Sequence, residues 1–154
     1  MSAVINALPR IEPMRLDDVD SVLAIECETH VFPWTRANFS DSLEAGYSAW
    51  VCRVDGVLVS YAVMLLVLDE AHLLNITVRR EWQRHGYGML LMTHLFSMAR
   101  VHGANCMLLE MRVSNLAGAG LYRRCGFLEI GQRKGYYAAA VGREDAIVMK
   151  AVLA

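Results

Sequence analysis

Two apolar runs joined by Asp-Gly constrain the fold more than any other part of the sequence. The runs "SAWVCRV" (48–54) and "VLVSYAVMLLVL" (57–68) are suited to strands, and Asp55 and Gly56 lie between them. Asp-Gly is a strong signal for the two-residue turn of a β-hairpin, because both turn positions need positive φ. The segment "AHLLNITV" (71–78) then resembles a third strand. We therefore expect residues 48–78 to supply three consecutive strands of one sheet.

The rest of the chain alternates between helical and strand-like segments. We expect a short strand at 10–14 and helices at 16–30 and 36–46, which Pro33 separates and Thr35 caps. Further along we expect a helix from Gly88 to about His102, a strand at 106–111, a helix at 116–125 closed by Gly126, and a final strand pair at 127–137 and 145–153. The order βααβββαβαββ predicts an α/β (α+β) fold, in which a mixed sheet carries helices on its faces.

Composition and length exclude several classes of protein. The 154 residues suffice for one substantial core, and we expect a single domain over 1–154. The longest apolar run, 61–68, is too short to cross a membrane, and no export leader is evident. A formal net charge of −1 argues against a general nucleic-acid-binding surface. The four cysteines and five histidines lack metal-binding spacing, so we expect reduced thiols and no metal. From these observations together we expect no membrane or nucleic-acid partner and a cytoplasmic location.

A basic turn with two glycines follows the third strand. In "EWQRHGYGML" (81–90), Gly86 and Gly88 permit a tight turn and close approach of a ligand to the backbone. The helix that follows presents unpaired N–H groups and the positive end of its dipole, and Arg84 and His85 add donors. This combination suits a phosphate or pyrophosphate, although a glycine-containing connection without a ligand has the same pattern. The spacing differs from the usual dinucleotide and nucleoside-triphosphate motifs.

Three polar residues lie in or shortly after the next segment, "CMLLEMRVSN" (106–115), which begins as a strand. Glu110 is expected near the end of that strand, Asn115 at the N-cap of the next helix, and Tyr122 on that helix. Each has a structural alternative: a salt-bridged carboxylate, a simple cap and a packing residue. Their grouping beside a phosphate-type turn favours a site that transfers protons.

These motifs resemble the GNAT superfamily of acetyl-coenzyme A-dependent N-acetyltransferases. The turn from Gln83 to Gly88 matches its [QR]xxGx[GA] signature. Four further segments, "FPWT" (32–35), "LDEAHLLNITV" (68–78), "LEMRVSN" (109–115) and "GREDAIVM" (142–149), are similar to the bacterial RimI-type ribosomal-protein-alanine N-acetyltransferases. The resemblance covers nearly the whole chain, and parts of it are shared with archaeal and eukaryotic N-terminal acetyltransferases.

The resemblance implies a mixed, mostly antiparallel twisted sheet with a splayed cofactor cleft, and acetyl-CoA as co-substrate. It assigns cofactor binding to Ile76, Thr77 and Val78 of the splayed strand, to Gln83, Arg84, His85, Gly86, Tyr87, Gly88 and Met89 of the turn, and to Asn115. It implies Glu110 as the general base and Tyr122 as the general acid. Cys125 lies on the same helix face as Tyr122 but has no evident histidine partner, so we expect direct transfer without a cysteine intermediate. The expected cost of Gly118 and Gly120 inside a helix is about 1 kcal/mol each.

The acceptor implied by the resemblance is the N-terminal α-amino group of a protein, specifically the N-terminal alanine of small-subunit ribosomal protein 18. Trp34, Tyr136 and Tyr137 are candidate walls of the peptide groove, or else they anchor loops to the core. The acids Asp69, Glu70, Glu144 and Asp145 either complement the basic residues of such a peptide or are ordinary solvated side chains.

Two alternative functions share most of these features. One is acetylation of a small amine, such as a polyamine or an aminoglycoside, which a panel of acceptors separates from peptide acetylation. The other is a non-catalytic regulator that binds acetyl-CoA, which Glu110 and Tyr122 disfavour. A purely structural protein leaves the phosphate-type turn and the polar group unexplained.

Overall fold

A seven-stranded mixed sheet forms the centre of the protein. The computed structural model describes residues 8–153. The strands are β1 (Arg10–Pro13), β2 (Ser48–Val54), β3 (Val57–Val67), β4 (Glu70–Val78), β5 (Cys106–Arg112), β6 (Leu128–Ala138) and β7 (Arg143–Val152). Their order in the sheet is β1-β2-β3-β4-β5-β7-β6, and among the described residues β4–β5 is the one parallel pair. The expected order of elements and the mixed, mostly antiparallel sheet are confirmed.

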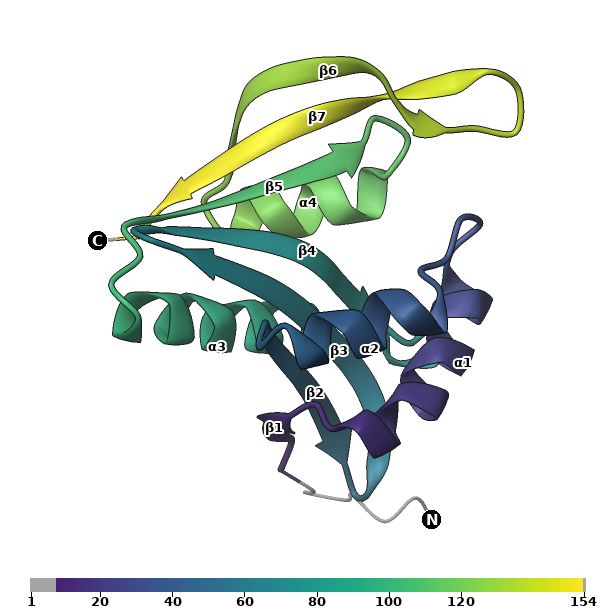
Figure 1. The fold of residues 1–154 in the computed structure, drawn as a ribbon, viewed down its shortest axis with the longest axis vertical. Coiled ribbons are helices and arrows are strands. Elements are labelled where there is room, and N and C mark those ends of the chain that lie inside the picture. Colours follow the sequence, from purple (N-terminus) through teal and green to yellow (C-terminus); the bar gives the residue numbers. More distant parts are fainter. Residues whose placement is uncertain (1–7, 154) are drawn as a thin grey trace.

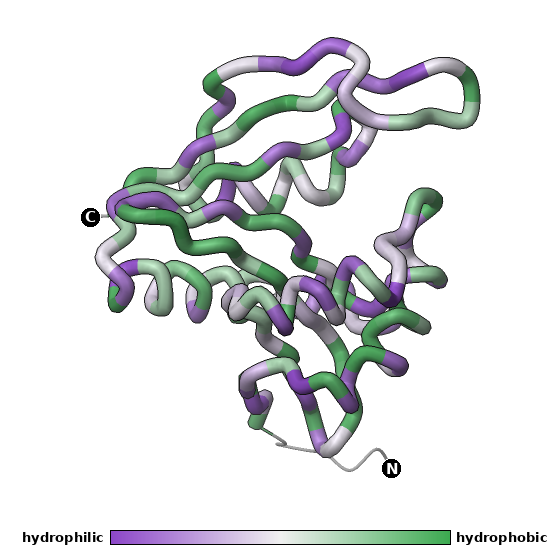
Figure 2. The backbone as a smooth tube through the Cα atoms, in the orientation of Figure 1, coloured by the Kyte–Doolittle hydropathy of each residue, from purple (hydrophilic) through white to green (hydrophobic). Residues whose placement is uncertain are grey.

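Four α-helices cover the two faces of this sheet (Figure 1). They are α1 (Val19–Thr29), α2 (Arg36–Glu44), α3 (Tyr87–Val101) and α4 (Leu116–Arg124), with short 3₁₀ turns η1 (Leu16–Asp18) and η2 (Arg80–Trp82). Leu91 of α3 and Tyr122 of α4 belong to one buried apolar cluster, whereas Val22 of α1 and Phe39 of α2 belong to another. In Figure 2 the apolar residues concentrate along the central strands between these helices. The sheet is therefore covered on both faces.

The β2–β3 hairpin forms as its sequence predicts. Asp55 and Gly56 have φ angles of 52° and 79°, the positive values that a two-residue hairpin turn requires. Val54 pairs with Val57 across the turn. The following strand, β4, continues the antiparallel sheet by pairing with β3 along its length. Local turn chemistry therefore suffices to specify this half of the sheet.

A β-bulge in β4 separates the two halves of the sheet. Asn75 pairs with Val63 and Leu73 pairs with Met64, so Leu74 is an extra residue that has no partner in this register. The parallel pairing of β4 with β5 covers only Glu70–Leu73 of β4 and stops directly before the bulge. Beyond that point β4 and β5 diverge, as Figure 1 shows. The splayed cleft implied by the resemblance is therefore present between them.

The first turn of α4 explains one of its two glycines. The Asn115 side chain caps the helix by accepting a hydrogen bond from the Gly118 N–H at 3.0 Å. A Cβ atom at Gly118 would lie 2.4 Å from Asn115 Nδ2, whereas a Cβ at Gly120 would meet only the end of the Arg124 side chain at 3.5 Å. Gly118 is therefore needed for the cap, but Gly120 is not.

We expect opposite results from alanine at these two positions. Gly120→Ala should raise the free energy of unfolding by about 1 kcal/mol, because alanine favours the helix, and so raise the melting temperature by roughly 2–4 °C. Gly118→Ala should show no such gain, because the displaced cap costs about 1 kcal/mol in return. Thermal and denaturant unfolding of the two variants measures the difference. Equal stabilisation would show that the close approach of Asn115 is unimportant.

Candidate active site

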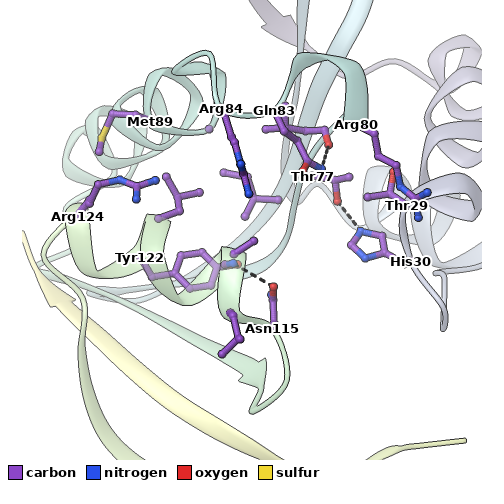
Figure 3. A pocket seen from close by; sticks show the side chains of 18 of the residues that line it. Thr29, His30, Thr77, Arg80, Gln83, Arg84, Met89, Asn115, Tyr122 and Arg124 are labelled. Carbon is purple, nitrogen blue, oxygen red and sulfur yellow. Dashed lines mark hydrogen bonds between the residues drawn. The ribbon is translucent and has the colours of Figure 1, made fainter.

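A cavity of about 1170 Å³ occupies the opening between the two halves of the sheet. Its wall includes ten of the residues predicted from the sequence: Ile76, Thr77, Val78, Gln83, Arg84, Gly86, Gly88, Met89, Asn115 and Tyr122. In Figure 3 Tyr122 and Asn115 lie on one side of this cavity, and Thr77 and His30 lie on the other. Segments that are distant in the sequence therefore meet at one site.

The predicted phosphate turn lies at the N-terminus of α3. Gly86 has a φ of 87° directly before the helix, and its carbonyl accepts the first helical hydrogen bond from Leu90 N–H at 3.0 Å. Gln83 Nε2 donates to the Val78 carbonyl oxygen at 2.9 Å, which ties the turn to the end of β4. The first N–H groups of α3 have no acceptor within the helix and lie beside the cavity. This geometry suits an anionic group.

The charge of the cavity wall differs from that of the whole chain. The described residues that line it include four arginines, Arg80, Arg84, Arg112 and Arg124, and no carboxylate. The chain as a whole has a formal net charge of −1. A concave site lined by one sign of charge concentrates the field and attracts ligands of the opposite sign. The cavity therefore favours a polyanionic ligand, although the overall charge gives no indication of this.

A buried carboxylate holds the splayed part of β4 against α1. Glu26 is 2% exposed, and its Oε1 accepts hydrogen bonds from Tyr61 OH at 2.7 Å and Asn75 Nδ2 at 3.1 Å. Its Oε2 accepts from the Trp34 N–H at 3.0 Å, which fixes the connection between α1 and α2. Burial and the nearby Glu26 raise the pKa of Tyr61 far above its ordinary value, so the phenol remains a donor. A buried charge satisfied in this way fixes both segments.

The bulge turns polar residues of β4 toward this network. Ala71 and Leu73, before the bulge, belong to the core beside α3. Asn75 and Thr77, after it, lie on the α1 side, where the Thr77 hydroxyl donates to Asn75 Oδ1 at 2.8 Å and lies 2.8 Å from His30 Nε2. Thr77 and His30 both line the cavity. The network thus extends from the core to the wall of the site.

Glu110 and Tyr122 lie on opposite faces of β5. Met107, Leu109 and Met111 share the buried cluster with Tyr122 on α4. Because side chains alternate along a strand, Glu110 and Arg112 point to the other face. Arg112 is the last residue of β5 and still lines the edge of the cavity, whereas Glu110 does not. Glu110 Oε1 lies 3.3 Å from Arg133 Nε, and Glu110 is not among the residues that line the cavity. The gap between β4 and β5 connects the two faces, so one ligand on each face can meet there.

Burial determines the protonation of Tyr122. Its side chain is 8% exposed, and burial raises its pKa to about 12, with smaller contributions from Tyr137 and Cys125. A phenol with that pKa stays protonated at neutral pH. Tyr122 therefore offers the cavity a neutral hydrogen-bond donor in a poorly solvated position.

The predicted acceptor residues occupy different environments. The Trp34 ring packs against Phe39, with the ring centroids 5.0 Å apart, beside the second core cluster. This contact favours the anchoring role that the sequence left open. Tyr136 and Tyr137 lie on β6 outside the cavity wall, and a hydrogen bond with Glu110 raises the pKa of Tyr136. Burial raises the pKa of Tyr137 to about 12.

The four predicted acids are largely engaged within the protein. Glu144 forms a salt bridge with Arg112 at 3.0 Å, and Asp145 accepts a hydrogen bond from the Gly135 N–H at 2.8 Å. Asp69 Oδ2 accepts from Asn105 Nδ2 at 3.2 Å, and Glu70 lies 3.3 Å from His72. Asp69 and Glu70 are also at the end of β4 away from the cavity. These contacts do not favour a role for the acids in binding a basic peptide.

Two of the predicted cofactor-binding residues do not line the cavity, and several residues that line it were not predicted. His85 is exposed, and the Tyr87 ring packs against Trp82 at 5.6 Å. Sequence reasoning missed a set of lining residues that lie in or next to four elements, α1, η2, β5 and α4: Thr29, His30, Arg80, Arg112 and Arg124. It also missed Glu26, although its spacing from the buried Val19 and Val22 places it on the inner face of α1.

Among residues 8–153, no group of three or more His, Cys, Asp or Glu side chains is arranged to hold a metal ion. Nor is any helix there long and apolar enough to span a membrane.

The fold and the site are typical of an acyltransferase, and similarity to known proteins identifies the family. Residues 19–127 match the Acetyltransferase (GNAT) family, and the chain belongs to that family. It is 36% identical over 139 residues to the [ribosomal protein bS18]-alanine N-acetyltransferase of Escherichia coli, covering 90% of this chain and 94% of that protein. The crystal structure of the ribosomal-protein-S18-alanine N-acetyltransferase from E. coli superposes with a TM-score of 0.88 at 34% identity, covering 96% and 95% of the two chains. A structure of Ard1 from Thermoplasma volcanium has a TM-score of 0.87 at 25% identity, covering 95% and 98%.

Side chains added at Gly86 should obstruct the phosphate turn. Gly86→Asn retains the positive φ with little strain, because asparagine tolerates that conformation. No neighbouring atom lies within 4 Å of a Cβ at Gly86, so the side chain enters the open turn without disturbing the core. We expect acetyl-CoA affinity, measured by calorimetry, to fall about tenfold or more, an estimate that equals about 1.4 kcal/mol.

Gly103→Asn is the matched control for this experiment. Gly103 has a similar φ of 84° and similar open space, but lies at the other end of α3. Its asparagine variant should bind acetyl-CoA as the unmodified protein does. Unchanged affinity in a folded Gly86→Asn protein would show that this turn does not bind the cofactor.

Proposed function

We propose that this protein transfers the acetyl group of acetyl-CoA to the N-terminal α-amino group of a protein, namely the N-terminal alanine of a small-subunit ribosomal protein. The observation that carries the proposal is the opening between β4 and β5, which has a basic phosphate turn and Tyr122 on one side and Glu110 on the other. The names of the E. coli relatives support the acceptor. Such an acceptor is made in the cytoplasm, which is where the proposal places this enzyme. The single continuous sheet supports one catalytic domain over 1–154.

Acetyl-CoA fits the chemistry of the cavity. Its phosphates match the N-terminus of α3 and Arg80, Arg84 and Arg124 of the wall, whereas Arg112 is paired with Glu144. Ile76, Thr77 and Val78 lie beyond the last residue of β4 that pairs with β5. Their backbone groups on that side are therefore available to pair with the amide groups of the pantetheine arm. Asn115 adds a polar side chain on the opposite wall. The cofactor supplies an activated acetyl thioester.

Glu110 is the proposed base for the acceptor amine. An α-amino group has a reference pKa of about 7.7–8.0, so much of it is protonated at neutral pH and cannot attack a thioester. Glu110 lies on the face of β5 opposite the one that packs against Tyr122, and we place the acceptor on this face, between the α1–α2 connection and the β6–β7 hairpin. Its carboxylate takes the proton directly or through a water molecule. The amine nitrogen then forms the new amide bond as the C–S bond breaks.

Tyr122 stabilises the departing thiolate in this proposal. An ordinary thiol has a pKa of about 8.5, whereas that of Tyr122 is raised to about 12. Full proton transfer from the phenol to the thiolate is therefore uphill in the unliganded site. A hydrogen bond from the phenol needs no such transfer and becomes stronger as negative charge develops on sulfur. We accordingly assign Tyr122 first to this donation, with any proton transfer following it.

Intact-mass measurement of candidate acceptors tests the function. After incubation with acetyl-CoA, a ribosomal protein beginning with alanine should gain one acetyl group at its N-terminus. Acetylation of polyamines or aminoglycosides alone would replace the proposal with a small-amine acetyltransferase. Tight acetyl-CoA binding without transfer to any acceptor would instead indicate a regulator.

Glu110→Gln should lower peptide turnover by about 10²-fold or more at pH 7, because the amide cannot accept the proton. The deficit should shrink near pH 9, where most of the acceptor amine is already neutral. Acetyl-CoA affinity should be nearly unchanged. Glu129→Gln, an exposed carboxylate on β6, is the matched control and should remain fully active. Wild-type turnover by Glu110→Gln at pH 7 would exclude Glu110 as the base.

Tyr122→Phe should lower kcat by roughly 10- to 100-fold, the loss expected for one hydrogen bond to a charged group. The KM values for peptide and acetyl-CoA should change little, because the lost interaction develops in the transition state. Since the pKa of Tyr122 is about 12, any decline in kcat between pH 8 and 10 should be the same in both proteins. If the substitution removes an alkaline decline in that range, Tyr122 titrates there and the assignment is wrong.

A further inference from the structure

Arg112, the last residue of β5, lies between two aromatic rings that belong to different parts of the chain. Its Cζ atom is 4.6 Å from the ring centroid of Phe32 and 4.5 Å from that of Tyr137. Phe32 is part of the α1–α2 connection, and Tyr137 is part of β6. The guanidinium group therefore contacts both rings, an arrangement called here the Phe32–Arg112–Tyr137 stack, and it connects the two segments that flank the proposed acceptor groove.

Polar contacts fix the guanidinium in this position. Arg112 Nη1 donates to the Ala138 carbonyl oxygen at 2.7 Å and to Glu144 Oε1 at 3.0 Å. Glu144 Oε2 in turn accepts from the Ser114 N–H at 2.9 Å, directly before the Asn115 cap of α4. Hydrogen bonds from Ser114 and Arg112 hold the pKa of Glu144 below its ordinary value. One side chain thus connects the α1–α2 segment, the β6–β7 hairpin and the start of α4.

These contacts require the chemistry of arginine. The planar guanidinium stacks on aromatic faces while its edge donates hydrogen bonds, and a lysine ammonium cannot do both. The side chains of Arg112 and Glu144 are 25% and 16% exposed, so their interaction is only partly screened by water. Nearby Arg133 has a looser environment: its side chain is 58% exposed and lies 5.5 Å from the Tyr136 centroid. Arg112 is thus the more constrained of the two cations.

The stack stands close to the expected position of the acceptor amine. Arg112 follows Glu110 by two residues and is on the same face of β5, a separation of about 7 Å along a strand. A residue bound at Glu110 has its side chain within that distance. Figure 2 shows apolar segments at the tips of the α1–α2 connection and the β6–β7 hairpin. Phe32 and Tyr137 belong to these two parts of the chain and meet at Arg112, so the stack would limit the first side chain of an acceptor bound there.

We propose that Arg112 is a positioning residue that sets the width of the acceptor groove, and that the Phe32–Arg112–Tyr137 stack restricts the acceptor to a small first side chain. This inference rests on the proposed function, because it assumes a peptide that enters between the α1–α2 connection and the hairpin. It assigns selectivity to an aromatic–cation stack that closes one end of the groove. In this proposal the selectivity for the first acceptor side chain depends on the planar guanidinium and the two ring faces, and not on the positive charge of Arg112 alone.

Two single variants test the stack while keeping the charge or the apolar character of the replaced side chain. Arg112→Lys keeps the positive charge and loses the planar fork, and Phe32→Leu keeps a large apolar side chain and loses the ring face. Phe32 is 43% exposed, so its replacement should leave the fold intact. Phe32→Tyr retains the ring face and serves as the conservative rescue. Arg143→Lys is the matched arginine control, because Arg143 donates within the hairpin to the Gly135 and Tyr136 carbonyl oxygens.

The measurement is kcat and KM on matched peptides that begin with alanine, serine or leucine. For Arg112→Lys and Phe32→Leu we expect KM for the alanine peptide to rise about tenfold, and the preference for alanine over leucine to fall about tenfold, the scale of a cation–π contact. The double variant should be little worse than either single variant, because both break one unit. Acetyl-CoA affinity should stay within about twofold, and Phe32→Tyr and Arg143→Lys should retain the preference.

The outcomes separate this inference from the proposed function. If the unmodified protein acetylates no peptide, the proposed function fails and the acceptor stack fails with it. If the unmodified protein acetylates the alanine peptide and folded Arg112→Lys and Phe32→Leu keep its KM and its preference, only the stack is overturned. If the melting temperature, acetyl-CoA affinity and kcat of these variants all fall while the preference for alanine is unchanged, the residues only support the fold. That result would also overturn the proposed role of the stack.

Discussion

The bulge at Leu74 is the constraint on which the site depends. Without the extra residue, β4 would keep the side-chain alternation of its first half, and Asn75 and Thr77 would face the core beside α3. With it, both polar side chains face α1 and join the network around Glu26. Pairing with β5 ends at the same place, so backbone groups of β4 become available to a ligand. A single inserted residue thereby produces both the opening and the polar wall.

The interrupted sheet is held together by other contacts. The Glu26 carboxylate provides them on one side of the interruption, and the Arg112–Glu144 ion pair provides them on the other. On the β4 side, Glu26 binds Tyr61, Asn75 and the Trp34 backbone. On the β5 side, Arg112 and Glu144 join the hairpin to the start of α4. Burying charge is unfavourable unless it is fully paired, so removing one partner would cost more than the pair itself contributes. Both sets of contacts also fix segments that flank the proposed acceptor groove. If the acceptor binds there as proposed, stability and substrate positioning depend on the same contacts.

Local patterns in the sequence were enough to predict most of the fold, because hairpins and caps depend on neighbouring residues. Asp55-Gly56 specifies its turn, and Thr35 and Asn115 cap their helices as expected. The bulge was not predicted, since neither glycine nor proline marks it, although alternation breaks where Leu73 and Leu74 adjoin. Trp34 illustrates a different limit: an aromatic residue after proline suits a groove wall or a core anchor, and its contact with Phe39, which favours the anchor, comes only from the structure. Arg112 stood within a recognised motif, but its partners come from three distant segments.

The residues that line the cavity differ in their exposure to solvent from one end of the cavity to the other. Gln83, Arg84 and Gly86 at the phosphate turn are exposed, whereas Thr77 and Tyr122 are almost fully buried. A polyanion bound at the exposed end keeps part of its hydration, while the thioester end enters a region where electrostatic interactions are stronger. The burial that raises the pKa of Tyr122 makes it a weaker acid, yet it strengthens a hydrogen bond from the phenol to a developing thiolate. In the proposed mechanism proton removal is assigned to Glu110, whose side chain is 28% exposed on the other face of β5. The two faces of β5 would then separate the proposed proton acceptor from the group proposed to stabilise negative charge.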